Sequence, residues 1–319
     1  MNRFLISNST DPFLNVAMEN YLLAQDEKEA VTLYLWRNHR TVVIGQNQNP
    51  YSECNVELLE SEGGHLMRRS TGGGAVYHDK ANLNFSFIVP KALYNQDKQF
   101  QVLRKAVESY GLSTELSGRN DVLCEGRKFS GNAFSRDKHQ YLHHGTILIK
   151  VNTADMQRYL KVKPAKLQKH GVASVRSRIV NLSELAPVTC EDITPRLKNA
   201  FDEIYGGEST VLSFEKLAQE EGVQILRNKF ESQEWRFARW RNFSAQRAKQ
   251  FAWGAVELSL QVDEEHHRIL NAQVATDALD TTLSQRLERL LIGADTTIPP
   301  DTCALSEEEK DVATLVWGQ

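Results

Sequence analysis

Three consecutive glycines, Gly72, Gly73 and Gly74, follow two adjacent arginines, Arg68 and Arg69, and lead into a predicted strand. Glycine inside an element costs backbone entropy, so a run of three predicts a backbone that passes a neighbour with no room for a Cβ atom. The two arginines favour an anionic ligand as that neighbour. A glycine hairpin with two solvated arginines is the alternative that this stretch leaves open.

The charge balance predicts that any anion site is local. The chain has 319 residues, with 38 Lys and Arg against 41 Asp and Glu, for a net charge of -3. Such a chain has no bulk attraction for nucleic acid or for an anionic membrane, and we expect neither as a partner. No apolar run approaches the roughly 20 residues that span a bilayer. The first 25 residues do not resemble a signal peptide, because polar residues interrupt them from Asn8 onward.

The four cysteines are Cys54, Cys124, Cys190 and Cys303, and no two of them have the spacing of metal ligands. Scattered single cysteines in a chain without a secretion signal indicate reduced thiols. We therefore expect a cytoplasmic protein without a zinc site.

The hydrophobic pattern predicts an α+β fold with a mixed sheet. Apolar residues at helical spacing follow Asp11-Pro12, and a second such run ends at Gly111. Four segments have strand character, and they are residues 31–36, 41–45, 83–87 and 145–151. Strands and helices alternate without a regular strand–helix–strand cadence, which favours a mixed sheet over a doubly wound parallel one.

A second, smaller unit is predicted after a polar connection at residues 240–250. Residues 256–262 and 269–274 alternate as in a hairpin, residues 283–291 are amphipathic, and acidic residues at 307–309 favour a helix start. We expect a catalytic domain at residues 1–245 and a small α/β accessory domain at residues 246–319.

The cationic residues beside glycine turns indicate chemistry other than covalent catalysis. The glycine run matches neither a P-loop nor a dinucleotide fingerprint. Lys128 lies among small residues and could bind a phosphate or carboxylate as a point charge, although an exposed lysine in a turn at Glu125-Gly126 is the alternative. Arg69, Lys128 and Arg176 together could stabilise charge on a transferring group. The pair His143-His144 has no further ligand at metal spacing, so we favour a structural role.

Ten blocks together resemble the lipoate–protein ligase family, in the order that the family shows them. They are residues 35–38, 41–45, 48–50, 53–55, 68–79, 117–121, 127–131, 143–146, 174–178 and 253–258. The resemblance implies a mixed-sheet catalytic domain like that of biotin ligases. It also implies an ATP-dependent reaction with Mg²⁺, in which lipoate becomes lipoyl-AMP and the lipoyl group then passes to a lysine of a carrier. The implied carriers are the lipoyl domains of 2-oxoacid dehydrogenase complexes and the glycine-cleavage carrier protein. We expect a monomer.

The resemblance also assigns site residues. Lys128 is implied as the catalytic residue that touches both the acyl group and the phosphate. The residues implied for ATP and the adenylate are Arg69, Gly74, Ala75, Val76, Tyr77 and Lys128. Those expected for lipoate are Lys128, Gly72, Gly73, Leu35 and Val43. Weaker candidates are Ser70, Asn120, Asp121, His144 and Arg176, with Asp121 also a candidate metal contact.

Three other functions stay open from the sequence. An ATP-independent lipoyl or octanoyl transferase would need Cys190 or Cys124 as its nucleophile. A biotin ligase is disfavoured by the Arg-Arg-Ser-Thr-Gly-Gly-Gly loop, and a non-enzymatic binding module by the presence of Lys128. The chain departs from the family pattern at Gln46, where other members have arginine.

Overall fold

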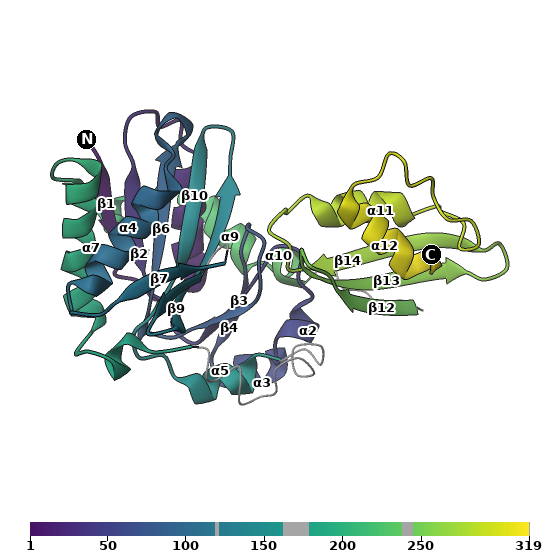
Figure 1. Cartoon of the computed structure of the whole chain (residues 1–319), viewed down its shortest axis with the longest axis horizontal. Coiled ribbons are helices and arrows are strands. Elements are labelled where there is room, and N and C mark those ends of the chain that lie inside the picture. The colour runs from purple at the N-terminus through teal and green to yellow at the C-terminus, as the bar shows by residue number, and fades with distance from the viewer. Residues whose placement is uncertain (119–120, 162–178, 238–244, 319) are drawn as a thin grey trace.

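The computed structural model describes residues 1–118, 121–161, 179–237 and 245–318. It contains a large N-terminal part and a smaller C-terminal part, which lie side by side in Figure 1. No helix among these residues has both the length and the apolar character needed to cross a membrane.

Both helices that the sequence predicts in the large part are present. Helix α1 (Pro12–Leu23) begins after Asp11, whose side chain accepts from the amides of Phe13 and Leu14, as a capping residue does. Helix α4 (Gln96–Glu108) is followed by Gly111, whose φ of 79° suits glycine after a helix end. The other longer helices of the large part are α7 (Cys190–Tyr205) and α9 (Glu221–Glu231).

The main sheet has the strand order β11-β1-β2-β6-β10-β9-β8-β7 among the described residues. Its strands are β1 (Arg3–Ile6), β2 (Thr32–Trp36), β6 (Asn82–Pro90), β7 (Thr114–Ser117), β8 (Asp121–Cys124), β9 (Arg127–Arg136), β10 (Gln140–Leu148) and β11 (Thr210–Val211). β1 runs parallel to β2 and β11, and the other pairs are antiparallel. The predicted mixed sheet is therefore confirmed. The strand expected at 145–151 begins earlier, at Gln140, and ends at Leu148.

A smaller sheet, in the order β4-β3-β5, carries the glycine run. Its strands are β3 (Thr41–Ile44), β4 (His65–Arg68) and β5 (Val76–His78). Residues 69–75, which we call the glycine loop, connect β4 to β5. The glycine loop is therefore tied at both ends to strands that flank β3.

The main sheet buries a different set of side chains on each face. Leu33 and Leu35 of β2 belong to a core cluster with residues of α4 and α7. Tyr34 and Trp36 belong to a second cluster with residues of α1 and α9. This division follows from the two-residue period of a strand. It decides which side chains of β2 can reach the site.

The C-terminal part is a three-stranded antiparallel sheet with two helices. Its elements are β12 (Ala245–Gln250), β13 (Ala255–Asp263), β14 (Arg268–Thr276), α11 (Leu283–Leu291) and α12 (Glu307–Trp317). The hairpin and both helices were predicted, and Ser306 and Glu309 form a capping box at the start of α12.

The polar connection predicted at residues 240–250 is wrong for its second half. Residues 245–250 form β12, which pairs with β13 along its whole length, whereas residues 240–244 lie outside the described residues. β12 is an edge strand, and Arg247 to Gln250 are exposed. An exposed edge strand needs no apolar alternation, so the sequence pattern did not reveal it. The domain division between residues 245 and 246 remains a proposal, and β12 begins one residue before it.

The remaining described elements are short. They are α2 (Pro50–Glu53), α3 (Val56–Ser61), α5 (Thr153–Tyr159), α8 (Phe214–Ala218), α10 (Gln233–Phe237) and the 3₁₀ turns η1 (Lys91–Leu93) and η2 (Leu182–Glu184).

Candidate active site

A cavity of about 260 Å³ lies between the main sheet and the glycine loop. Its lining comes from α1, from strands β2, β3, β5, β6, β9 and β10, and from the glycine loop. The lining residues are Val16, Glu19, Trp36, Val43, Arg69, Gly73, Gly74, Ala75, Val76, His78, Asn84, Lys128, Gly131, Asn132, Ala133, His144, Gly145 and Thr146. The cavity therefore brings together Lys128 and the glycine loop, which are far apart in the sequence.

The buried guanidinium of Arg69 holds the glycine loop from inside. Its Nη2 atom donates to the carbonyls of Gly72 (2.7 Å) and Gly74 (2.9 Å), its Nη1 to the carbonyl of Val43, and its Nε to Thr71 and to the carbonyl of Gly72. Burial lowers the pKa of Arg69 to about 10, so the side chain still carries its charge at neutral pH. Arg69 lines the cavity, but most of its donors are used to shape the loop.

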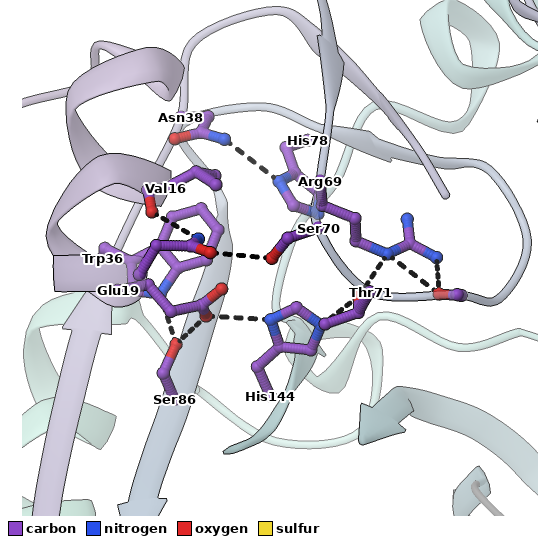
Figure 2. Close-up of polar contacts among 12 residues, drawn as sticks. Val16, Glu19, Trp36, Asn38, Arg69, Ser70, Thr71, His78, Ser86 and His144 are labelled. Carbon is purple, nitrogen blue, oxygen red and sulfur yellow. Dashed lines mark hydrogen bonds and ion pairs between the residues drawn. The ribbon is translucent and has the colours of Figure 1, made fainter. Parts of the chain in front are cut away.

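A chain of polar contacts connects the glycine loop with α1 (Figure 2). His144 Nδ1 donates to Glu19 Oε2 over 2.8 Å, and its Nε2 lies 3.0 Å from the Thr71 hydroxyl, which also accepts from Arg69. Ser86 donates to the same Glu19 oxygen and accepts from the indole of Trp36. The Oε2 atom of the buried Glu19 thus has two hydrogen-bond partners, as a buried polar group requires. His144 is a bridging residue of the cavity wall.

Lys128 lines the cavity from β9. Its Nζ atom is 2.7 Å from Asp121 Oδ1, and both side chains are about one-third exposed. A Cβ atom on Gly131 would lie 2.9 Å from this Nζ, so the absence of a side chain at Gly131 leaves room for the ammonium group in its present position. The turn at Glu125-Gly126, which belonged to the alternative interpretation of Lys128, is present, since both residues have positive φ. That turn places Lys128 at the start of β9, facing the cavity.

The glycine loop and β5 face the cavity with Gly73, Gly74, Ala75, Val76 and His78, whereas Tyr77 points away. His78 is buried, and its Nδ1 lies 3.3 Å from the side-chain amide of Asn38. Burial, together with the charge of Arg69, lowers the pKa of His78 to about 3. The imidazole is therefore neutral at physiological pH.

Two of the expected ligand residues do not line the cavity. Leu35 does not line the cavity, because its side chain lies on the α4 and α7 face of β2, and Trp36 takes the place expected for it. Tyr77 packs against Tyr159, with ring centroids 5.6 Å apart, on the far side of β5. Both positions have the same cause, since neighbouring residues of a strand point to opposite faces.

Two further expected residues lie beside the cavity rather than in its wall. Ser70 donates to Asn20 of α1 over 2.8 Å. Gly72 faces the C-terminal part, where a Cβ atom would lie 2.2 Å from the carbonyl oxygen of Ala278. Asn120 and Arg176, the remaining weaker candidates, lie outside the described residues.

Sequence reasoning missed several residues of the cavity wall, among them Glu19, Trp36, His78 and Asn84. Glu19 gave one available signal, because it falls on the buried side of a helix where a carboxylate needs a partner. The other missed residues lie inside or next to the blocks that resemble the family. Their order along the chain does not show that their side chains line one cavity.

The C-terminal part contacts the glycine loop directly. The Gly73 amide donates to the carbonyl of Ala278 over 3.4 Å. Asn47 accepts from the amide of Thr276 (3.1 Å), and its side chain donates to the carbonyl of Thr281 (2.9 Å). The segment 276–281 therefore packs on the outside of the glycine loop, on the side away from the cavity.

The thiols and carboxylates lie outside the cavity or are already paired. The described residues contain no group of three His, Cys, Asp or Glu that could hold a metal ion. None of the four free cysteines lines the cavity. Burial raises the pKa of Cys54 to about 12 and also raises the pKa values of Cys124 and Cys190. A raised pKa lowers the fraction of the reactive thiolate at neutral pH.

Comparison with known families gives two matches. The lipoyl protein ligase A/B catalytic domain matches residues 11–202, and the bacterial lipoate protein ligase C-terminus matches residues 241–299. Among solved structures, the chain is similar to P. falciparum LipL1 in complex with lipoate. The two are 28% identical with a TM-score of 0.82, over 100% of this chain and 98% of that chain.

Two other solved structures share the fold. One is a bi-partite lipoate protein ligase from Thermoplasma acidophilum, described together with its E2 lipoyl domain, at 24% identity and a TM-score of 0.64 over 76% of this chain and 99% of that one. The other is a lipoate-protein ligase A bound with ATP, at 24% identity and a TM-score of 0.62 over 74% and 98% of the respective chains.

Proposed function

The chain belongs to the lipoyl protein ligase A/B family, and on this premise we propose that it is an ATP-dependent lipoate–protein ligase. The observation that carries this proposal is the position of Lys128. Its ammonium group and the backbone of residues 73–76 line the same cavity. A carboxylate and a triphosphate repel each other, so a site that joins them needs a cation and close backbone donors at the point where they meet.

The first half-reaction joins lipoate to AMP. A carboxylate oxygen of lipoate attacks the α-phosphorus of ATP, an acyl–phosphate bond forms, and pyrophosphate leaves. Lys128 would hold the carboxylate against the phosphate and stabilise the charge that develops on both. The glycine loop would contribute backbone amides near the phosphate, with Arg69 fixing the loop in shape. P. falciparum LipL1 with lipoate and the ATP-bound ligase A support these ligand classes.

In the second half-reaction, the amine of a carrier lysine attacks the acyl carbon. An amide bond forms, AMP leaves with the bonding electron pair, and the nitrogen of the neutral amine loses one proton to solvent or to a nearby base. We propose lipoyl domains as the carriers, including those of 2-oxoacid dehydrogenase complexes and the glycine-cleavage carrier protein. The ligase from T. acidophilum that was described with its E2 lipoyl domain supports this class of partner.

The cavity suits the acyl part of the adenylate. Val16, Val43, Val76 and Trp36 supply apolar surface for the hydrocarbon chain. The volume of about 260 Å³ lies near the lower end of the ~300–1,000 Å³ of common ligand pockets, so the nucleotide must extend beyond it. Mg²⁺ would enter with the phosphates. Asp121 could supply one oxygen ligand, and no step above depends on the ion.

The alternative is a transferase that moves the acyl group through a cysteine thioester without ATP. The positions of Cys124 and Cys190, outside the cavity and with raised pKa values, favour the ligase. The two functions differ in one product, since only the ligase releases pyrophosphate.

The proposal is tested by incubating the purified protein with lipoate, ATP, Mg²⁺ and a purified lipoyl domain. Mass spectrometry should show a lipoyl adduct on one lysine of the domain, and pyrophosphate should appear in equal amount. Omission of ATP should abolish both signals, and excess biotin should not compete. Modification from an acyl carrier without ATP or pyrophosphate would establish the transferase instead.

A further inference from the structure

Arg68 has a buried guanidinium group that no step of the proposed reaction uses. It is 3% exposed and does not line the cavity, whereas its neighbour Arg69 does. A buried charge requires hydrogen bonds, and Arg68 donates to backbone carbonyls of two separate segments. Nη1 donates to the carbonyls of Gly45 (3.2 Å), Gln46 (2.9 Å) and Gln48 (2.7 Å), while Nε donates to that of Trp235 (3.1 Å) and Nη2 to that of Arg236 (2.8 Å).

The first of these segments, residues 45–48, is the turn that follows β3, and we call it the outer turn. Its backbone packs against the glycine loop. The amide of Gln46 donates to the carbonyl of Thr71 over 2.9 Å. A Cβ atom on Gly45 would lie 2.3 Å from the carbonyl oxygen of Gly73, so no side chain fits between the turn and the loop. A shift of the outer turn must therefore shift the glycine loop as well.

The outer turn also holds the C-terminal part. The backbone carbonyl of Asn47 accepts from the amide of Thr276 over 3.1 Å, and its side chain donates to the carbonyl of Thr281 over 2.9 Å. Asn47 is itself buried, so water does not compete for these hydrogen bonds. The outer turn is therefore in contact with both the glycine loop and the docked C-terminal part.

The second segment is the end of the large part. Trp235 and Arg236 belong to α10, the last described element before β12, and Figure 1 shows α10 where the two parts meet. The indole of Trp235 donates back to the carbonyl of Arg68 over 2.7 Å. One guanidinium group thus fixes the segment from which the chain leaves the large part and the turn on which the C-terminal part docks.

We propose that Arg68 is a positioning residue that couples the docking of the C-terminal part to the shape of the glycine loop, and through the loop to the binding of ATP. This inference rests on the proposed function and adds a residue that acts on the nucleotide without touching it. The planar fork of arginine reaches carbonyls on two sides at once, whereas the ammonium group of lysine is a single point of charge. Lipoate binds within the cavity, which Arg68 does not line, so its binding should not depend on these contacts.

The first test measures KM for ATP and KM for lipoate separately in pyrophosphate release. Arg68→Lys keeps the charge and removes the fork, so it should raise KM for ATP about tenfold and leave KM for lipoate within twofold of wild type. A purely structural role would lower the amount of active enzyme, and with it the apparent kcat, without changing either KM. A wild-type KM for ATP in Arg68→Lys would overturn the inference.

Arg104→Lys is the matched control. The guanidinium group of Arg104 donates to the carbonyl and the hydroxyl of Thr114, at the start of β7 and outside the glycine loop. This variant loses contacts of the same kind, and both of its KM values should equal those of wild type. A rise in KM for ATP in the control as large as that in Arg68→Lys would show a general effect of the substitution and overturn the assignment to Arg68.

The second test uses Asn47→Ala, which leaves Arg68 in place and removes the hydrogen bond to Thr281. It should raise KM for ATP about fivefold, although Asn47 does not line the cavity. The double variant with Arg68→Lys should be no worse than Arg68→Lys alone, because both substitutions interrupt the same path. Effects that multiply to about fiftyfold would show independent roles and overturn the coupling.

Asn47→Ala also decides the case if Arg68→Lys does not fold, since an unchanged KM for ATP in Asn47→Ala would by itself overturn the inference. A wild-type protein that releases no pyrophosphate from lipoate and ATP would instead refute the proposed function. Normal wild-type activity with unchanged KM values in the variants would refute only the role of Arg68, so the two failures are distinguishable.

Discussion

The Nζ atom of Lys128 lies 2.7 Å from Oδ1 of Asp121, at the edge of the cavity and across the β8–β9 hairpin. Both side chains are about one-third exposed, so the pair is solvent-screened and adds little to stability. The pair instead sets the position of the ammonium group, since Asp121 holds this group in place before substrates arrive. A carboxylate or phosphate that enters the cavity can then take over part of this contact.

Replacement of Lys128 by alanine should therefore remove activity without unfolding the protein. We expect adenylate formation to fall by ~10²–10³-fold, the usual cost of losing one donor to developing charge. Pyrophosphate release in the presence of lipoate and ATP measures the effect. Lys138→Ala, at an exposed position in the β9–β10 turn, is the control and should retain full activity. Unchanged activity in Lys128→Ala would remove the basis of the proposed function.

Arg69 is expected to act on the nucleotide through the loop that it holds. Arg69→Lys removes the planar fork that reaches the carbonyls of Gly72, Gly74 and Val43. The unsatisfied carbonyls should lower the free energy of unfolding by about 1–3 kcal/mol. Urea denaturation measures this change, with the exposed Arg289→Lys as the control. A variant as stable as wild type would show that the loop does not depend on this clamp.

The contact between Gly72 and Ala278 gives a steric prediction. In Gly72→Ala, the new Cβ atom would lie 2.2 Å from the Ala278 carbonyl oxygen, so the C-terminal part must move away from the loop. In Gly74→Ala, the Cβ atom meets nothing within 4 Å. Limited proteolysis should cleave Gly72→Ala faster than Gly74→Ala in the segment between the two parts. Equal cleavage rates would argue against this contact in solution.

The neutral state of His78 gives a pH dependence of stability. Its pKa falls from the ordinary 6.5 to about 3 in the folded protein. Below pH 6.5, the unfolded chain therefore binds a proton that the folded chain does not, and stability decreases as the pH falls toward 3. The slope from this one residue approaches ~1.4 kcal/mol per pH unit.

Urea titrations between pH 6 and pH 5 measure this slope in a range where most carboxylates remain ionised. His78→Asn should reduce the slope by close to one proton, with any contribution from a second buried histidine, His143, retained. Identical slopes in wild type and variant would mean that His78 is protonated in the folded state.

The cysteines are expected to be dispensable. Burial raises the pKa values of Cys54, Cys124 and Cys190, and Cys303 is exposed in the C-terminal part. Replacement of all four by alanine or serine should leave at least half of the ATP-dependent transfer to a lipoyl domain. Loss of transfer in the Cys190 or Cys124 single variant, with the fold intact by circular dichroism, would favour the thioester mechanism of the transferase.

The sequence by itself determined the local elements and the chemical character of the site. The Gly72–Gly74 run, the turn at Glu125-Gly126 and the capping residues Asp11 and Ser306 act within a few residues of the chain, so their effects are visible in the chain order. The mixed sheet followed from the alternation of strands and helices. Lys128 and the glycine loop were recognised as parts of one site because their blocks occur together in a known family.

Tertiary structure alone decided which side chains share the cavity. The contact between Glu19 and His144 joins residues 125 positions apart, and the docking of Ala278 on the glycine loop joins two separate sheets. Trp36 rather than Leu35 lines the cavity, and this depends on which face of β2 the smaller sheet covers. Arg69 donates mainly to carbonyls of its own loop, because the folded backbone brings these carbonyls next to its guanidinium group. Burial and hydrogen bonding between distant segments set these outcomes, and no local pattern encodes them.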